Sequence, residues 1–172
     1  LWQSGRASWD GEYFSLDDCS VLPVPKRSIP LVCAGQSPAG REFVACYADH
    51  QFVLTSEENL VTSVEDIRAK SAISGRNVGI YALFHMVLAD TDDAAEAQVQ
   101  QIIDAADHGA ISNILASASL DTNTGGTSDQ LKAALDQDVE KGNMAFMGIP
   151  VIYGSAETVR QRIEAIVKRT GI

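Results

Sequence analysis

The residues best suited to chemistry in this sequence lie between an apolar run and the start of a helix. Gly35-Gln36-Ser37-Pro38 follows the apolar residues 31–34. Ser37 is a preferred N-cap residue, and Pro38 suits the first helical position because its missing N–H is not needed there. The free N–H groups at such a helix N-terminus can bind a phosphate. The same pattern also fits an ordinary connection between a strand and a well-capped helix, and the residues alone leave both interpretations open.

Other candidate residues give weaker patterns. His85 lies within an apolar strand, where a buried core histidine is the simpler interpretation and a catalytic histidine the alternative. His50 and His108 are expected in loops without a specific role. Asp17-Asp18 and Asp92-Asp93 are neighbours in sequence, which favours turn and cap chemistry over an acid/base pair.

Cavity-lining and metal-binding patterns are equally weak. Met144, Phe146 and Met147 could line a cofactor or substrate cavity, although core packing is the simpler interpretation. The sequence holds no Ser-His-Asp order, no Cys-x-x-Cys and no His-Glu-x-x-His. We therefore expect neither a hydrolase nor a metal site.

Composition limits the class of protein. The 172 residues suffice for one domain, and 13 Lys and Arg against 23 Asp and Glu give a net charge of -10. Without a basic cluster, a transmembrane run or a signal peptide, we expect a soluble cytoplasmic protein with no nucleic-acid or membrane partner. Cys19, Cys33 and Cys46 are expected to be free and mostly buried thiols. Because the chain begins at Leu1, we expect a processed protein or a piece of a longer one.

Strand and helix patterns alternate through the middle of the sequence. Residues 1–28 predict an exposed hairpin, with strands at 10–16 and 20–24 around a turn at Asp17-Asp18. Residues 29–106 predict three strand–helix units of a parallel α/β sheet. Their expected elements are strands at 31–34, 51–55 and 78–88, and helices at 38–47, 63–73 (opened by Ser63 with Asp66) and 91–106 (capped by Thr91).

The alternation stops after residue 106. Residues 107–154 predict an insertion or active-site lid, with helices at 110–118 and 131–141 around a polar loop at 121–128. Ser155 is expected to cap a last helix within residues 155–172.

Several segments of the chain form one recognisable pattern. They are Gly11-Glu12-Tyr13-Phe14, Asp18-Cys19, Pro23, residues 33–40 (Cys-Ala-Gly-Gln-Ser-Pro-Ala-Gly), Tyr47-Ala48-Asp49, residues 75–79, residues 89–95, and the segment from Gly142-Asn143-Met144 through Tyr153-Gly154-Ser155. Together these segments resemble the luciferase-like flavin-dependent monooxygenases, and within them the members that open the uracil ring. The similarity covers nearly the whole chain.

The resemblance implies a fold and a chemistry. The family has a (β/α)8 barrel, of which this chain matches only the second half. Its members take reduced FMN from a separate NAD(P)H-dependent reductase, react it with O2 and insert one oxygen atom into a small-molecule substrate. The family's phosphate-contacting serine corresponds to Ser37, with the backbone of Gly35 and Gln36 beside it. With the resemblance, phosphate binding becomes the preferred interpretation of this turn.

The same resemblance leaves questions open. Most family contacts to the flavin ring and substrate come from the first half of the barrel, so no catalytic residue is assigned here and the fragment alone is expected to be inactive. A half-barrel exposes two strand edges, so we expect it to pair with another part or copy, as in a homo-oligomer. Two alternative functions remain: a deazaflavin (F420)-dependent oxidoreductase of the same superfamily, and an inactive half-barrel that serves as a binding or folding unit.

Overall fold

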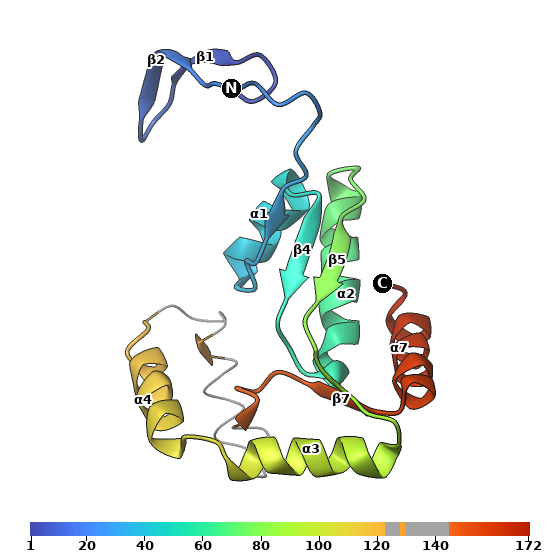
Figure 1. The fold of residues 1–172 in the computed structure, drawn as a ribbon. Helices are drawn as coiled ribbons and strands as arrows, with labels where there is room; N and C mark the ends of the chain where they lie inside the picture. Colours follow the sequence, from blue (N-terminus) through green and yellow to red (C-terminus); the bar gives the residue numbers. More distant parts are fainter. Residues whose placement is uncertain (123–127, 130–144) are drawn as a thin grey trace. The chain divides into compact units, whose positions relative to one another are not determined.

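Strand and helix alternate along most of this chain, after an N-terminal hairpin. The computed structural model describes residues 1–122, 128–129 and 145–172 (Figure 1). The chain divides into two units, Leu1–Leu31 and Val32–Ile172, which we describe separately. The partial barrel domain expected over residues 1–172, with its internal boundaries, stays a prediction.

The first unit contains an antiparallel hairpin of β1 (Arg6–Asp10) and β2 (Ser15–Ser20). The predicted strands and turn are wrong, because the chain reverses between residues 11 and 14. Asp17-Asp18 lies inside β2, where the strand register shifts. Asp18 has a φ of 46°, and its carboxylate pairs with Arg6 on the opposite strand. An aspartate tolerates this left-handed backbone at a β-bulge. Asp17-Asp18 therefore bends strand β2 instead of forming the turn between β1 and β2.

The second unit contains two parallel sheets. One has the order β3-β4-β5 and the other pairs β6 with β7. The strands are β3 (Val32–Cys33), β4 (His50–Val53), β5 (Gly79–Ala82), β6 (His85–Leu88) and β7 (Val151–Gly154). The parallel alternation predicted from the sequence is therefore confirmed.

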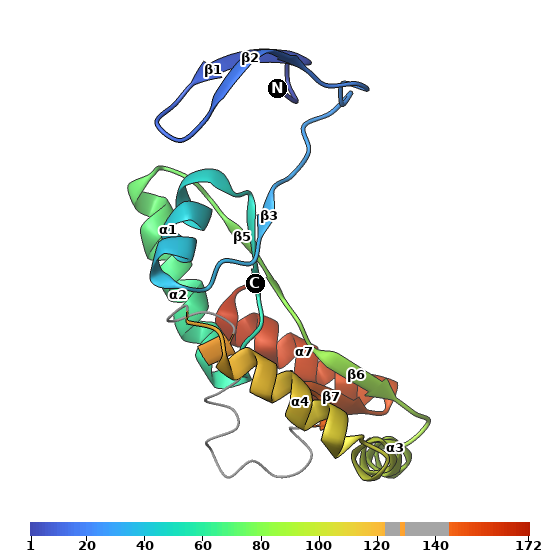
Figure 2. The same cartoon turned by 90° about the vertical axis from the view of Figure 1, so that its left-hand side faces the viewer.

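The single strand predicted at 78–88 is wrong, because it is divided between the two sheets. Figure 2 shows β5 leading directly into β6. The N–H of Leu83 still bonds to the carbonyl of Val53 at 3.2 Å, whereas the N–H of His85 bonds to Pro150 at 2.9 Å. The apolar run is continuous in sequence. The segment to which its backbone is hydrogen-bonded changes between Leu83 and His85, from the end of β4 to the residue just before β7.

The helix starts follow the predicted caps, with one exception. The helices are α1 (Pro38–Tyr47), α2 (Glu57–Ile73), α3 (Asp92–Asp104), α4 (His108–Ser119) and α7 (Ala156–Thr170). Ser37, Thr91 and Ser155 cap α1, α3 and α7, as predicted.

The capping box predicted at Ser63 and Asp66 is wrong. Helix α2 begins two turns earlier, where the side chain of Ser56 accepts the N–H of Asn59. Ser63 lies inside the helix, and its hydroxyl donates to the carbonyl of Asn59 at 2.9 Å. Both serines have suitable neighbours in sequence, and the packing of Leu60 in the core selects the earlier start.

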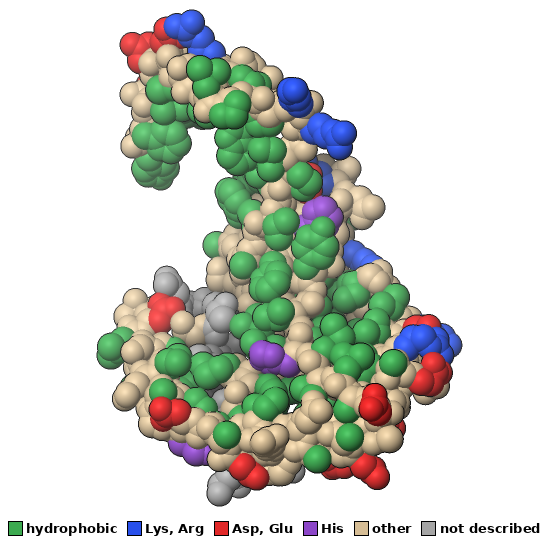
Figure 3. All heavy atoms as spheres, in the orientation of Figure 1, with side chains coloured by type: hydrophobic (Ala, Val, Ile, Leu, Met, Phe, Trp, Pro, Cys, Tyr) green, Lys and Arg blue, Asp and Glu red, His purple; other side chains and the backbone are tan. Residues whose placement is uncertain are grey.

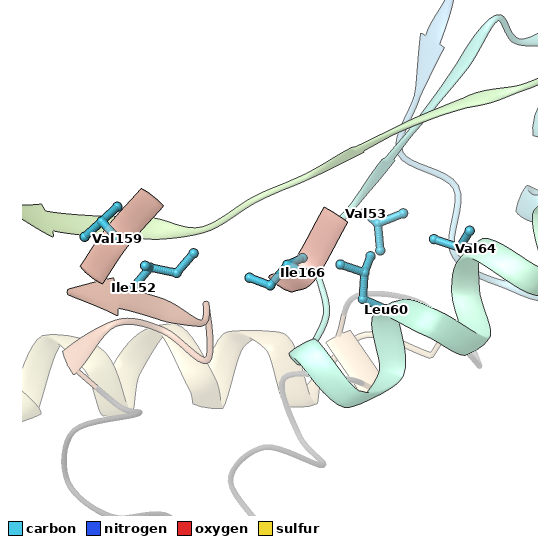
Figure 4. Close-up of a cluster of buried hydrophobic side chains, with 6 residues drawn as sticks. All are labelled: Val53, Leu60, Val64, Ile152, Val159 and Ile166. Atoms are coloured by element: carbon cyan, nitrogen blue, oxygen red, sulfur yellow. The ribbon is translucent and has the colours of Figure 1, made fainter. Parts of the chain in front are cut away.

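The helices bury one face of the β3-β4-β5 sheet. Figure 4 shows the larger core cluster, in which α2 and α7 meet β4 and β7. Its buried members are Val53, Leu60, Val64, Ile152, Val159 and Ile166. On the opposite sheet face, Val32 and Tyr81 each remain 49% exposed. Figure 3 shows hydrophobic side chains over the β4–β5 region.

The region predicted as an insertion contains a further strand. Helix α4 agrees with the helix predicted at 110–118, and β7 pairs in parallel with β6. The described residues therefore hold a fourth strand–helix unit, β7 with α7. The helix predicted at 131–141 and residues 123–127 of the predicted loop lie outside the described residues. None of the described helices is long and apolar enough to cross a membrane.

Candidate functional site

Ser37 occupies the position predicted from the sequence. It is the N-cap of α1, and its Oγ accepts the N–H of Gly40 at 3.1 Å. Because a hydroxyl also has a proton to give, Ser37 can still donate to a ligand. Pro38 has no N–H. The N–H of Ala39 lies in the first turn of α1, where a helix has no hydrogen-bond partner for it. The start of α1 therefore offers donors to an anion.

Gly35 and Gly40 bring the loop and the first turn of α1 into close contact. A Cβ added to Gly35 would lie 2.9 Å from the Cα of Gly40, and a Cβ added to Gly40 would lie 2.9 Å from the Cα of Gly35. Such distances between a side chain and backbone are too short for real contacts. Both positions therefore require glycine, because the backbone of each occupies the space that a side chain on the other would need.

Gln36 does not present its side chain to a ligand. The residue is 6% exposed, and its Oε1 accepts the N–H of Leu54 at 3.1 Å. Only its backbone lies along the loop between β3 and α1. The predicted trio of Gly35, Gln36 and Ser37 is thus one continuous turn, with one inward side chain and one available hydroxyl.

Sequence reasoning missed Gln51. This residue of β4 is 1% exposed, and its Nε2 donates to the carbonyl of Gly35 at 2.9 Å. A signal was present, because Gln51 and Val53 share one face of a predicted strand whose inward face should be apolar. A polar residue in that pattern indicates a specific partner.

Charge distinguishes the N-terminus of α1 from those of the other described helices. Helix α1 has a neutral cap and no acidic residue in its first turn. The others carry carboxylates there: Glu57 and Glu58 in α2, Asp92 and Asp93 in α3, the cap Asp107 in α4, and Glu157 in α7. A carboxylate satisfies the positive end of a helix dipole and repels a second anion. Among the described helices, α1 is the one with no carboxylate at its cap or in its first turn.

The N-terminus of α7 receives a second carboxylate from outside the helix. Asp92 Oδ1 accepts the N–H of Ser155 at 2.6 Å, and Oδ2 accepts the hydroxyl of Thr158 at 2.9 Å. The hydrogen bond from Ser155, followed by that from Thr158, lowers the pKa of Asp92 below its ordinary value. The expected cap chemistry of Asp92 therefore extends from its own helix to a second one.

The histidines differ from their predictions. His85 is exposed in β6, with its ring 5.3 Å from that of Phe146, so the prediction of a buried core histidine is wrong. His50 lies in β4 and His108 begins α4, so neither is in a loop. Phe146 is buried, as core packing predicts, and Met147 is half-buried. Met144 lies outside the described residues.

The thiols are free, as predicted, but they are not mostly buried. Cys19 and Cys33 are half-buried and Cys46 is exposed.

Within the described ranges, no group of three or more His, Cys, Asp or Glu side chains is arranged to hold a metal ion. The candidate site at the start of α1 consists of backbone groups and the Ser37 hydroxyl, and the side-chain amides of Gln36 and Gln51 tie its turn to β4 and the residue that follows it.

Known proteins are similar to this chain over nearly its whole length. Residues 1–172 match the family model described as luciferase-like monooxygenase. The chain is 35% identical over 168 residues to the pyrimidine monooxygenase RutA of Bradyrhizobium sp. (strain BTAi1), covering 95% of this chain and 45% of the relative. It is 33% identical over 175 residues to the RutA of Pseudomonas savastanoi pv. phaseolicola, covering 99% and 47%. This chain thus spans less than half the length of these relatives.

Solved structures have a similar fold. DmoA from Hyphomicrobium sulfonivorans matches 95% of this chain and 40% of its own, with a TM-score of 0.73 and 24% identity. Riboflavin lyase RcaE, solved with modified FMN and riboflavin, matches 97% and 42%, with a TM-score of 0.73 and 21% identity. An F420-dependent secondary alcohol dehydrogenase matches 99% and 49%, with a TM-score of 0.62 and 17% identity.

These likenesses show an α/β luciferase-like fold. The match to the family model and the identity to RutA proteins confirm the resemblance noted in the sequence. The chain belongs to the luciferase-like monooxygenase family.

Proposed function

We propose that this chain is the second half of an FMN-dependent monooxygenase that opens the ring of uracil or a similar small cyclic amide. The substrate class rests on the names of the relatives, which are pyrimidine monooxygenases at 33% and 35% identity. The protein would work in the cytoplasm as a homo-oligomer and receive reduced FMN from an NAD(P)H-dependent reductase. We also propose that the chain forms an incomplete barrel, which carries the hairpin and an insertion at 107–154.

The order of elements supports a half-barrel. Four helices each follow a parallel strand among the described residues: α1 after β3, α2 after β4, α3 after β6 and α7 after β7. A (β/α)8 barrel has eight such units, with its ligand at the carboxyl ends of the strands. The turn before α1 lies at that end of β3.

One observation carries the cofactor assignment: α1 has the one neutral and acid-free N-terminus among the described helices. The phosphate of FMN is an anion of suitable size for such a place. The close contact between Gly35 and Gly40 fixes the backbone of the turn against the first turn of α1, next to the hydroxyl of Ser37. The residues present therefore fit the phosphate end of the cofactor.

Each residue of the turn has a defined part in binding. The hydroxyl of Ser37 would donate to a phosphate oxygen while its Oγ still accepts from Gly40. The N–H of Ala39 and the dipole of α1 add attraction for the negative charge. Reduced FMN, when bound, supplies the electrons with which O2 is activated, so that one oxygen atom enters the substrate. The chain's own contribution is to fix the phosphate and thereby orient the cofactor.

Titration with FMN, followed by fluorescence quenching, tests this proposal. Ser37→Ala should weaken FMN binding about tenfold, since it removes a hydrogen bond to a charged group. Ser37→Asp keeps a good cap but adds a negative charge, so it should weaken binding further. Ser56→Ala is the matched control, because it removes the cap of α2 at an acidic N-terminus.

The outcomes separate the alternative functions. Equal FMN affinity in the wild type and Ser37→Ala would show that the phosphate is bound elsewhere. A deazaflavin enzyme would instead release F420 on cofactor extraction, identified by its absorption spectrum. An inactive half-barrel would retain neither cofactor, and neither the wild type nor the variants would bind FMN.

A further inference from the structure

Gln51 is a buried amide that touches the turn before α1. It lies in β4, where it pairs with Cys33 of β3 on one side and Ile80 of β5 on the other. Its residue exposure is 1%, and its Nε2 lies 2.9 Å from the carbonyl oxygen of Gly35. The amide therefore reaches from the middle of the sheet to the first residue of the candidate phosphate turn.

Only one of the two polar atoms of the Gln51 amide has a hydrogen-bond partner. The Oε1 of Gln51 is buried and finds no hydrogen-bond partner in the part of the chain that the structure describes. A buried polar atom without a partner costs about 1–3 kcal/mol, whereas an apolar side chain of similar size would fill the same space. Val53, two residues along the same face, packs in the core without that cost. The glutamine thus leaves Oε1 unsatisfied while its Nε2 holds the Gly35 carbonyl.

The amide restricts the orientation of one peptide group. A peptide unit is planar, so a hydrogen bond that holds the Gly35 carbonyl also sets the plane that continues into Gln36. Gly40 abuts Gly35 from the other side, where an added Cβ would lie 3.0 Å from the Gly40 oxygen. Gly35 is therefore held between the amide of Gln51 and the first turn of α1.

A second amide ties the same turn to the end of β4. The Oε1 of Gln36 accepts the N–H of Leu54 at 3.1 Å, and Leu54 directly follows β4. The two glutamines thus connect successive residues of the turn to one strand, one through a donor and one through an acceptor. Neither side chain points toward a ligand at Ser37, so their effect on a ligand has to be indirect.

We propose that Gln51 is a positioning residue for the cofactor phosphate, acting through the carbonyl of Gly35 and the turn that ends at Ser37. This inference rests on the proposed function. Loss of the Gln51 amide would release the Gly35 carbonyl, so the turn would lose part of the geometry in which Ser37 and the first N–H groups of α1 converge on one anion. Binding of the phosphate would weaken, while contacts to the rest of the flavin would not change.

The test compares oxidised FMN with riboflavin, which lacks the phosphate, in the protein carrying Gln51→Met. Methionine is close to glutamine in size but has no N–H to donate. We expect FMN affinity to fall about tenfold and riboflavin affinity to change less than about twofold, since only the phosphate contacts are disturbed. Inorganic phosphate should compete with FMN in the wild type and much less in the variant.

Two further variants keep the test decisive. Gln51→Asn retains an amide but is one methylene too short to reach Gly35, so it should reproduce the selective loss even where the methionine variant folds poorly. Val64→Ala, in the core cluster away from the turn, should lower stability and leave the ratio of FMN to riboflavin affinity unchanged.

The outcomes distinguish this inference from the proposed function. If the wild type prefers FMN to riboflavin and Ser37→Ala lowers that preference about tenfold, the phosphate site stands. An unchanged preference in both Gln51 variants would then overturn the positioning role alone. No preference for FMN in the wild type would overturn the phosphate site and the role of Gln51 together.

Discussion

The imidazole of His50 lies parallel to the phenol ring of Tyr81, with ring centroids 4.7 Å apart and 9° between the planes. The two residues belong to β4 and β5, which pair in parallel, and His50 is directly opposite Gly79. A Cβ on Gly79 would lie 2.4 Å from His50 Cδ2. The glycine therefore leaves the room in which the imidazole can lie flat against Tyr81.

Gly79→Ala should displace the imidazole from this position. The added methyl group forces the His50 side chain to rotate, so we expect a loss of about 1–2 kcal/mol in the free energy of unfolding, as for other overpacked sites. Urea denaturation measures the change. Gly109→Ala in α4 is the control, because its methyl meets only the Asp107 carboxylate at 3.2 Å and alanine favours a helix. Equal stability in both variants would contradict the proposed packing.

Gly40→Ala should damage the phosphate turn and the fold together. The new Cβ would lie 2.9 Å from Gly35 Cα and 3.1 Å from Ser37 Oγ, so the backbone of the turn has to shift. We expect FMN binding to become too weak to measure and the free energy of unfolding to fall by about 1–3 kcal/mol. Isothermal titration and urea denaturation of the same preparation check both effects. Unimpaired FMN binding would show that the glycine contact is not needed for the site.

Asp92→Asn should reduce stability in a pH-dependent manner. The hydrogen bonds from Ser155 and Thr158 lower the pKa of Asp92 below 3.8, so the folded state binds this proton less readily than the unfolded state. The resulting stabilisation is fully present well above the ordinary carboxyl pKa and is lost as the pH falls through the lowered pKa of the folded state. We therefore expect a lower Tm for the variant at neutral pH and convergence with the wild type in acid.

Calorimetry across the acid range measures this convergence. Asp93→Asn is the matched control, because Asp93 is the neighbouring residue and its carboxylate is also in the first turn of α3. A constant difference in Tm between Asp92→Asn and the wild type at every pH would exclude the carboxylate charge as the cause.

Glu57→Gln should loosen the contact between α2 and α7. The Glu57 side chain is 14% exposed and pairs with Arg162 and Arg169 of α7. Because both arginines are about half exposed, we expect a loss of only about 0.5–1 kcal/mol, which added salt should diminish. Glu157→Gln, which removes a pair within α7, should leave Tm nearly unchanged. The Tm of each variant, measured at low and at high salt, checks this prediction. Equal losses of Tm in Glu57→Gln and Glu157→Gln would contradict it.

Local sequence patterns predicted the features that depend on neighbouring residues. Ser37, Thr91 and Ser155 cap their helices as predicted, because an N-cap needs only a hydroxyl and the N–H groups that follow it. Helix α1 has its predicted bounds for the same reason. The turn at Gly35 and Ser37 was likewise identified from residue types alone.

Competing local solutions could not be ranked from the sequence. Both Ser56 and Ser63 could start α2, and both the residues near Gly11 and the pair Asp17-Asp18 could turn the hairpin. In each case several residues have suitable propensity, and contacts with distant segments decide among them. For Asp18 that contact is Arg6, and for α2 it is the burial of Leu60.

By itself, the sequence determined the alternation of strand and helix, the start of most helices and a turn suited to an anion, because each follows from hydrogen bonding and apolar spacing over a few residues. Only the tertiary structure decided that Gln51 holds Gly35 and that Asp92 binds the start of α7. These contacts join residues 16 and 63 positions apart, and no local pattern encodes which distant group a buried polar side chain will meet.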